Sequence, residues 1–472
     1  MRHLFLAPAF LLAGCGALGP EYQTPAALTP QQYRAGDAGN TESPSAIGQA
    51  DWWTIFADPQ LNELEAAART GSQQLKAAYA RLQQARAVAR ASEAELWPRV
   101  NLGTDVARTR QTENRPIQPG STALSFTSNR IRLPLDFSYE IDLWGRVERA
   151  SEAQLARAQA SGQAYRTAAL SLHAEVAQLY FSLRALDSER ALLRATIDFR
   201  HKALALINAR FRGGVSGELD VARAETELAT AQSEAIGLER RRADLEHALA
   251  ALTGRNPSEF SLAESPLEQE PPAIPAGLPA ELLQRRPDVI EAERLLAARS
   301  AEIGVAKGAF FPSIRLTGFA GFESTELSDL TSSGSRVWSF GPAVTLPLFD
   351  GGRNDANLER AKAAFDENLA NYRQRILVAF QEVESALAAL RILAEQAGAQ
   401  ANAVSTAQRT AHISNARYRA GLVAYLEVID AERTALQNQR LAVQIRGQRL
   451  VNAVSLIKAL GGGWLDGQNV GS

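Results

Sequence analysis

The sequence contains few residues whose type and spacing could support catalysis or metal binding. Four histidines lie beyond the first residues, all within predicted helices and no two of them four residues apart: His173, His201, His247 and His412. No HExxH pattern, no GxxxxGK followed by Ser or Thr, and no GxGxxG after a predicted strand occurs. The many carboxylates fall on helix faces that we interpret as solvated. We therefore predict no enzyme, no cofactor and no metal site.

The single cysteine, Cys15, excludes an intramolecular disulfide and a cysteine-based metal site. It follows a positively charged start and an apolar run from Leu4 to Ala13, which is typical of a secretory signal and too short to span a bilayer as a helix. Residues 12–15, LAGC, resemble a bacterial lipobox, and Gly16 resembles the residue that directs sorting to the outer membrane. We expect Cys15 to be acylated and to become the mature N-terminus; the alternative is an ordinary signal with a chance cysteine.

One charged constellation has a spacing that could matter for function. Leu426, Asp430 and Arg433 follow one another at i, i+4 and i+7, so they share one face of a predicted helix, and Glu427 lies beside them. From spacing alone, Asp430 and Arg433 could be an ordinary surface pair that stabilises the helix by a few tenths of a kcal/mol.

Composition narrows the class of protein. The chain has 472 residues and a net charge of -2, so no basic excess points to nucleic acid. Hydrophobic residues make up 46%, which excludes general disorder. Alanine is frequent and aromatic residues are few, a composition that favours closely packed helices.

The charged constellation belongs to a stretch that occurs twice. Residues 416–439 match residues 209–232 at an offset of 207, and Gly254 matches Gly461 at the same offset. Upstream, Trp97-Pro98 matches Phe311-Pro312 at an offset of 214. A length change confined to one interval is what a loop tolerates, so we predict one body built from two copies of helix, β-hairpin, long helix, turn and helix.

The helical part of each copy is long. Residues 144–210 and 353–419 lack proline and predict helices of about 100 Å at 1.5 Å per residue. A helix of each copy returns after the turn, over 218–252 and 424–459, and a shorter one precedes the hairpin, over 72–97 and 287–311. The two shorter helices should stack end to end along the long one. Residues 254–287, rich in proline, and 461–472 should form a belt at the junction.

In the predicted β-hairpins the hydrophobic pattern repeats every two residues, as in a strand. Residues 131–141 alternate apolar and polar side chains, and residues 314–322 and 338–348 repeat the pattern. Residues 100–106 alternate more weakly, so the pattern predicts two hairpins and four strands. A half-buried sheet of a soluble domain is one interpretation. Strands of about ten residues behind an export signal favour a membrane β-barrel, and since four strands cannot close a barrel, several chains must contribute to it.

Motifs along the whole chain resemble those of the outer membrane factors, the TolC-like proteins, and in particular their OprM/NodT-type lipoprotein branch. The residues that carry the resemblance, in chain order, are Leu12–Cys15, Trp52-Trp53, Arg285–Val289, Phe310–Pro312, Leu346–Arg353, Ala416–Arg419, Asp430–Arg433 and Ala459–Trp464. The resemblance implies a trimer with a 12-stranded barrel in the outer membrane and a periplasmic α-helical tunnel. It also implies docking to a periplasmic adaptor and an inner-membrane pump of the RND type.

The resemblance assigns roles to two sets of residues. The turns between the long helices are expected to dock the adaptor: Gly213, Gly214, Val215 and Ser216 in the first copy, and Gly421, Leu422 and Val423 in the second. Leu426, Asp430 and Arg433 match positions lining the closed periplasmic aperture, and Glu427 matches an acidic aperture position. The first copy departs from this pattern, so its helix is expected to brace the second, with Arg223 reaching an acid of the gate.

The expected fold is mainly α with a membrane β-barrel, internally duplicated. Its divisions are a signal peptide at 1–14, a lipid-anchored extended segment at 15–60, helices of the first repeat at 61–98, β-hairpins at 99–143 and 313–350, helical hairpins at 144–253 and 351–460 with tips at 212–217 and 419–424, a helix at 287–312, and equatorial segments at 254–286 and 461–472. The expected function is passive export of drugs or other small toxic compounds across the outer membrane. An exit duct for type I protein secretion and a periplasmic coiled-coil scaffold remain alternatives.

Overall fold

The computed structural model describes residues 18–27, 29–34, 51–114, 125–275, 277 and 279–462. Cys15 and residues 463–472 lie outside these ranges. The chain divides into two compact units. The first unit comprises Met1–Pro25, Leu82–Ser161 and Ala292–Tyr372, and the second comprises Ala26–Arg81, Gly162–Glu291 and Arg373–Ser472.

The helices follow the duplication. The α-helices are α1 (Pro59–Gly71), α2 (Gln73–Glu93), α3 (Arg146–Arg212), α4 (Glu218–Leu252), α5 (Pro279–Arg285), α6 (Pro287–Gly308), α7 (Arg353–Arg419) and α8 (Tyr425–Ala459). Short 3-10 helices occupy Trp52–Phe56, Ala94–Leu96, Pro257–Glu259, Leu327–Asp329 and Ser333–Ser335. The equivalent helices α3 and α7 have 67 residues each, and α4 and α8 have 35 each. The helices that follow the β-hairpin therefore have the same lengths in the two copies.

Two local features differ from what periodicity alone suggests. Residues 254–287, predicted to be irregular, contain the short helix α5 and a 3-10 turn. The helical pattern that starts at Pro59 is broken at Ser72, which separates α1 from α2. A Cβ at Gly71 would lie only 2.1 Å from the carbonyl oxygen of Thr253, so the break is where the chain passes closely over the end of α4.

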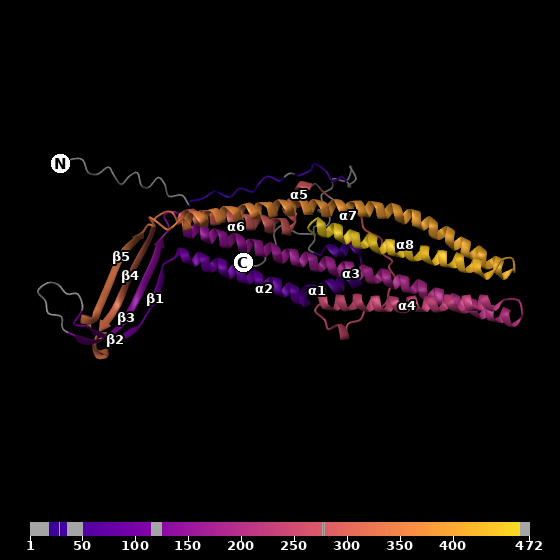
Figure 1. The fold of residues 1–472 in the computed structure, drawn as a ribbon, viewed down its shortest axis with the longest axis horizontal. Coiled ribbons are helices and arrows are strands. Elements are labelled where there is room, and N and C mark those ends of the chain that lie inside the picture. The colour runs from indigo at the N-terminus through magenta and orange to yellow at the C-terminus, as the bar shows by residue number, and fades with distance from the viewer. Residues whose placement is uncertain are drawn as a thin grey trace. The chain divides into compact units, whose positions relative to one another are not determined.

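The sheet of the first unit is antiparallel (Figure 1). Its strands are β1 (Arg99–Leu102), β2 (Asp105–Gln111), β3 (Phe126–Ile141), β4 (Ser313–Ser324) and β5 (Arg336–Thr345). β1 and β2 both pair with β3, β3 pairs with β4, and β4 pairs with β5.

β1 and β2 are one strand with an interruption. Leu102 faces Leu135 and Asp105 faces Arg132, so the register does not change across the gap. In the gap, the Gly103 amide donates to the carbonyl oxygen of Pro134 at 2.9 Å, but proline has no N–H with which to complete the ladder. The sheet therefore has four strand positions, as the sequence predicts.

The alternation places apolar and polar residues on opposite faces. Residues directly paired across strands share a face, and one face collects apolar side chains from every strand. These are Val100, Leu102, Val106, Ile131, Leu133, Leu135, Phe137, Tyr139, Ile141, Ile314, Leu316, Ala320, Phe322, Trp338, Phe340 and Val344. Several are open to the surroundings, with Trp338 exposed to 75%. In one chain this face is an extended apolar surface.

The opposite face carries ion pairs. The Arg130 guanidinium lies 2.9 Å from the Asp105 carboxylate, and Arg132 lies 3.4 Å from Glu323. The outer edges of β1–β2 and of β5 pair with no other strand among the residues that the structure describes. Each chain thus has a two-faced sheet with two open edges.

The second unit has the larger core. The 3-10 helix with Trp52 and Trp53 packs with α1 against residues 172–183 of α3, together with the ends of α4 and α8. The hydroxyl of Tyr180 donates to the Asp58 carboxylate at 2.7 Å, and Asp58 also caps α1 by accepting from the Leu61 amide. The helices of both copies therefore meet in one core.

A buried ionic network fixes the segment that follows α4. The Asp187 carboxylate accepts from Arg184 at 2.7 Å and from Arg242 at 2.8 Å. These arginines also donate to backbone carbonyl oxygens of the segment, Arg184 to Ala263 and Arg242 to Leu262. Because every charge is paired and hydrogen-bonded, the cost of burying the charges is offset.

A second buried polar pair is electrically neutral. His173 Nδ1 lies 2.7 Å from Glu65 Oε2, and the Trp53 ring stacks on the imidazole at 4.5 Å. Burial raises the pKa of Glu65 to about 9 and lowers the pKa of His173 to about 4. Near pH 7 the pair is therefore an uncharged carboxylic acid beside a neutral imidazole.

This pair makes stability depend on pH in a defined direction. Between pH 4.5 and 9 the folded chain keeps the Glu65 proton that the unfolded chain releases, so stability falls as pH rises, by up to about 1.4 kcal/mol per pH unit. Between pH 4 and 6.5 the unfolded chain protonates His173 and the folded chain does not, so this group contributes an increase in stability with pH.

The variant Glu65→Gln removes only the first effect. We expect the Tm of the variant, relative to that of the wild type, to increase steadily from pH 5 to pH 9 in thermal unfolding of the detergent-solubilised protein. Glu63→Gln, which changes an exposed carboxylate of the same helix, is the matched control and should show no such trend. A Tm difference for Glu65→Gln that stays constant with pH would contradict the assignment.

Candidate functional site

The two turns between the long helices have the same backbone geometry. In the first, the Val215 amide donates to the Arg210 carbonyl oxygen at 2.9 Å, and Gly214 has φ +70°. In the second, the Leu422 amide donates to the Arg417 carbonyl oxygen at 3.0 Å, and Gly421 has φ +77°. This is a six-to-one helix-terminating bond around a glycine in the left-handed region, which a residue with a Cβ adopts only at a cost.

Each turn presents an apolar side chain to its surroundings. Val215 is exposed to 78% and Leu422, its equivalent in the second copy, to 69%. The Ser216 hydroxyl donates to the Asp220 carboxylate at 3.0 Å, which fixes the start of α4. Gly213 is exposed and Val423 is half-buried. The seven residues predicted at the two tips therefore surround two similar exposed turns.

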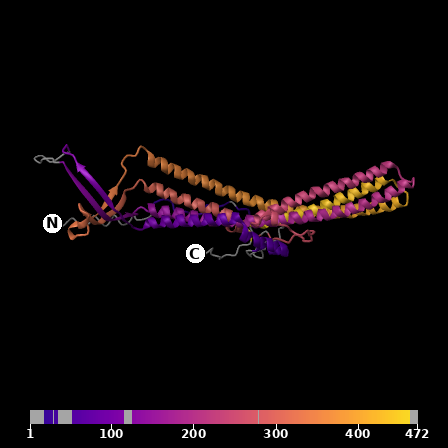
Figure 2. The ribbon, with the colours of Figure 1, turned by 90° about the horizontal axis from the view of Figure 1, so that it is seen from below.

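The two tips are joined behind these turns. Figures 1 and 2 show the ends of the α3–α4 and α7–α8 hairpins side by side, and a buried cluster connects them: Ile207, Ala224, Tyr418, Tyr425, Val428 and Ile429. Arg210 of α3 lies over the Tyr418 ring at 4.5 Å and donates to the backbone carbonyl oxygens of Tyr418 and Arg419 at the end of α7. A cation at a helix C-terminus also interacts favourably with the helix dipole. The two tips are consequently packed together as one end of the second unit.

The face of α8 that begins after the second tip is open. Leu426, Glu427 and Asp430 are all exposed, while Val428 and Ile429 on the opposite face are buried in the cluster behind the tips. Within the described part of the chain the Asp430 carboxylate has no ion pair, and it does not form the local pair with Arg433 that spacing allows. Among the described residues, the side chains of three of the four residues predicted on this face of α8 thus form no ion pair or hydrogen bond.

Arg433 binds a residue that the sequence did not single out. Its guanidinium contacts the Glu227 carboxylate of α4, and this hydrogen bond raises the pKa of Arg433. Glu227 is buried and is also paired with Arg200 of α3 at 2.9 Å. One glutamate of the first copy therefore holds an arginine from each hairpin.

The contact between α4 and α8 recurs one heptad along, but there one arginine holds two glutamates. Arg440 of α8 lies 2.6 Å from Glu234 of α4 and 2.5 Å from Glu189 of α3. Arg433 and Arg440 are seven residues apart, as are Glu227 and Glu234, so the contacts form an arginine–glutamate ladder between the hairpins. The sequence does show these charges at heptad spacing on two predicted helices. Spacing alone, however, does not identify which helices lie next to each other in the fold.

Arg223 does not reach α8 within its own chain. Its guanidinium lies 3.8 Å from the Asp220 carboxylate, one turn earlier in α4. A contact of Arg223 with an acid of another copy stays a prediction.

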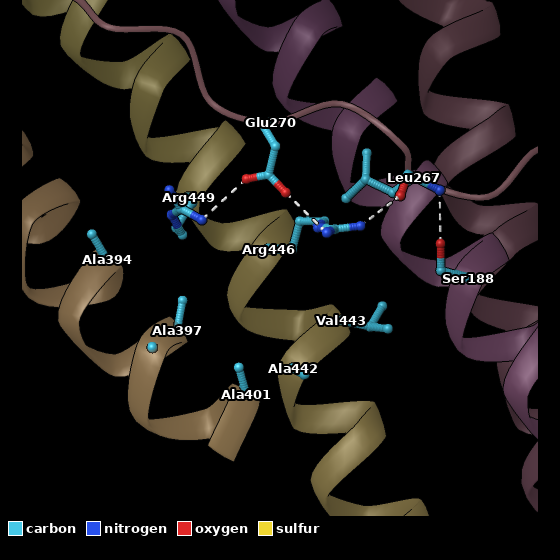
Figure 3. Close-up of a pocket in the computed structure, with 11 residues that line it drawn as sticks. Ser188, Leu267, Glu270, Ala394, Ala397, Ala401, Ala442, Val443, Arg446 and Arg449 are labelled. Atoms are coloured by element: carbon cyan, nitrogen blue, oxygen red, sulfur yellow. Dashed lines mark hydrogen bonds and ion pairs between the residues drawn. The ribbon is translucent and has the colours of Figure 1, made fainter. Parts of the chain in front are cut away.

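Two grooves follow the helical hairpins. One, of about 490 Å³, runs between α4 and α8 beside the arginine–glutamate ladder. The other, of about 540 Å³, lies between α7 and α8 (Figure 3). There α7 presents only small residues, among them Ala394, Ala397 and Ala401. Glu270 bridges Arg446 at 2.9 Å and Arg449 at 3.3 Å on α8 (Figure 3).

Neither a metal-binding cluster nor a helix suited to span a membrane is found in the described ranges. They contain no group of three or more His, Cys, Asp or Glu side chains placed to hold a metal ion. Among their helices, none combines the length and the apolar character needed to span a membrane.

Comparisons with known proteins agree with the duplication and the fold. The family model described as outer membrane efflux protein matches residues 65–255 and 278–462, one match for each copy. The chain is 35% identical to outer membrane protein OprJ of Pseudomonas aeruginosa over 98% of this chain and 95% of OprJ. It is 32% identical to the probable outer membrane lipoprotein SilC of Salmonella typhimurium over 99% of both chains.

The fold is also that of a solved channel. The MtrE outer membrane channel of Neisseria gonorrhoeae, solved in its open state, superimposes with a TM-score of 0.84 and 31% sequence identity. The match covers 95% of this chain and 98% of MtrE. The chain therefore belongs to the outer membrane efflux protein family, and it is an outer-membrane channel component of an efflux system and not an enzyme.

Proposed function

We propose that three copies of this chain form the exit duct of a tripartite efflux pump and passively conduct drugs or other small toxic compounds out of the periplasm. A periplasmic adaptor would dock on the helical tips and connect the duct to an inner-membrane pump of the RND type. Three chains with four strand positions each supply twelve strands, a number compatible with closed barrels of the outer membrane.

The observation that carries this proposal is the sheet with one apolar face and two open edges. An apolar face of this extent suits a hydrocarbon environment. Unpaired edge groups in such an environment cost several kcal/mol each, so β5 of one copy must pair with β1–β2 of the next. A coiled-coil scaffold in the periplasm needs neither feature.

The lipid anchor is tested by separating it from the barrel. We expect Cys15→Ser, exported by a signal peptide without a lipobox, to remain in the outer membrane as trimers and to support resistance. The reason is that acyl chains add membrane affinity at about 0.8 kcal/mol per buried CH₂, whereas the barrel holds the protein independently. Membrane fractionation and native electrophoresis give the answer; a soluble periplasmic monomer would rule out the barrel.

The docking role of the tips can be tested by introducing a charged residue at each tip. Val215→Glu and Leu422→Glu place a carboxylate on the exposed apolar residue of each tip and should abolish drug resistance, because a desolvated charge in the adaptor contact is costly. Trimers should stay in the membrane, since neither side chain is buried in the chain. Val215→Thr keeps the volume without charge and is the matched control. Normal resistance of both glutamate variants would remove the docking role.

The gate is tested by a double variant. In the proposed closed state, three copies of Leu426 constrict the tunnel, while Glu427, Asp430, Arg433 and Arg223 contribute to a weak ionic network around the axis. Asp430→Ala with Arg433→Ala removes the network in all three copies. At about 0.5–1 kcal/mol per copy, the closed-to-open ratio should fall about ten- to a hundredfold.

Single-channel conductance in planar bilayers measures this change, and sensitivity of cells to vancomycin reports it in vivo. The double variant should still fold, because Glu227 keeps Arg200 as a partner. Arg240→Ala removes an exposed ion pair with Asp244 on α4, away from the tips, and should leave conductance near the wild-type value. If the double variant conducts like the wild type with intact trimers, the gate lies elsewhere.

A further inference from the structure

The arginines of the sheet fall into two groups that differ in face and in pairing. On the polar face, four arginines each lie within ion-pair reach of an acid: Arg99 with Glu95, Arg130 with Asp105, Arg132 with Glu323, and Arg315 with Glu140. The other strand arginines are Arg108, Arg110 and Arg336. In the ranges that the structure describes, these three form no ion pair or hydrogen bond through their side chains, and all three are exposed.

The register places these three arginines on the apolar face. Arg108 and Arg110 of β2 alternate with Val106, whose partner across the strands is Ile131. Arg336 of β5 is paired with Phe322. An unpaired arginine on an apolar face would be costly in hydrocarbon, so its height on the sheet decides its environment.

All three lie at the same end of the apolar belt. The helices leave from the opposite end, where Ile141 faces Ile314. From there to Ile131 is ten residues, about 33 Å along a strand, or about 25 Å across a membrane at the usual tilt. Arg108 and Arg110 come two and four residues beyond Val106, the partner of Ile131, and so lie beyond this limit. Arg336 is the first residue of β5 and comes just beyond Trp338; its register partner Phe322 faces Leu133, so it lies about 7 Å inside the Ile131 limit. In the outer membrane that limit is the headgroup region of the outer leaflet.

Their spacing creates a local excess of positive charge. Arg108 and Arg110 are two residues apart on one face, about 7 Å, and repel each other when no anion is present. The acids near them in sequence do not compensate this charge. Asp105 lies on the polar face and pairs with Arg130. Glu113, Glu326 and Asp329 lie beyond the strands and form no ion pair with the three arginines among the described residues. Closure of the barrel puts the β5 edge beside the β1–β2 edge of the next copy, so Arg336 joins this rim.

We propose that Arg108, Arg110 and Arg336 bind the phosphate groups of phosphorylated glycolipids in the outer leaflet, at each junction between two copies. A guanidinium binds phosphate through paired hydrogen bonds, and three uncompensated guanidinium groups at headgroup height match an anionic lipid. The apolar belt below them would hold the acyl chains of the same lipid. This inference rests on the proposed trimeric barrel, because only closure brings the two edges together.

The test is native mass spectrometry of full-length trimers extracted in mild detergent and then offered rough lipopolysaccharide. We expect the wild type to retain roughly three lipids per trimer. The triple variant Arg108→Gln, Arg110→Gln and Arg336→Gln should retain at least about tenfold less. The control, Arg130→Gln with Arg315→Gln, changes arginines of the polar face and should retain as much as the wild type.

A second arm uses only the wild type and so does not depend on whether a variant folds. Lipid whose phosphates have been removed enzymatically should bind at least about tenfold more weakly, whereas inorganic phosphate at millimolar concentration should not displace the bound lipid. Equal retention of the dephosphorylated lipid, or full retention by the triple variant, would overturn the proposal. Trimer mass and channel conductance are recorded in parallel: their loss in the wild type would refute the barrel itself, and not merely the lipid site.

Discussion

The two open edges of the sheet are the constraint on which the rest of the structure depends. β5 and the β1–β2 strand each leave a row of backbone N–H and C=O groups that pair with no other strand in the described part of the chain. In hydrocarbon such groups cannot be satisfied by water, so another copy of the sheet must supply the partners. Assembly is then a condition for inserting the sheet at all. Rotational symmetry follows from it, and it repeats every helix face around one axis.

The two copies of the duplicated unit share a backbone geometry but differ in their charged residues. Both tips end their long helices with the same bond around a left-handed glycine, so the backbone of the turn has been kept. The return helices have diverged in charge: α8 carries Arg433 and Arg440, and α4 carries Glu227 and Glu234. Opposite charges at equal heptad spacing hold the second hairpin on the first. The exposed face of α8 is left free to meet other copies.

Much of this fold can be predicted from the sequence because its signals are local. The alternation in β3, the long helices without proline and the glycine turns each report a backbone preference within a few residues. The interruption at Gly103 could not be predicted, because its cause, Pro134, is a neighbour only through the strand register. The Arg433–Glu227 contact was missed for the same reason. Its partners are 206 residues apart, and the sequence does not give the rotation of one helix against another.

The position of Glu227 suits a reversible gate better than a permanent lock. A buried carboxylate that loses its sole cation leaves an uncompensated charge, which costs several kcal/mol. Glu227 has two cations, and its contact with Arg200 at 2.9 Å does not involve Arg433. Arg433 is more than half exposed, and Asp430, which forms no ion pair among the described residues, lies one turn away on the same helix. In the proposed gate Arg433 can therefore exchange partners at small cost, which keeps the closed and open states close in free energy, so an adaptor with modest differential affinity can shift the equilibrium.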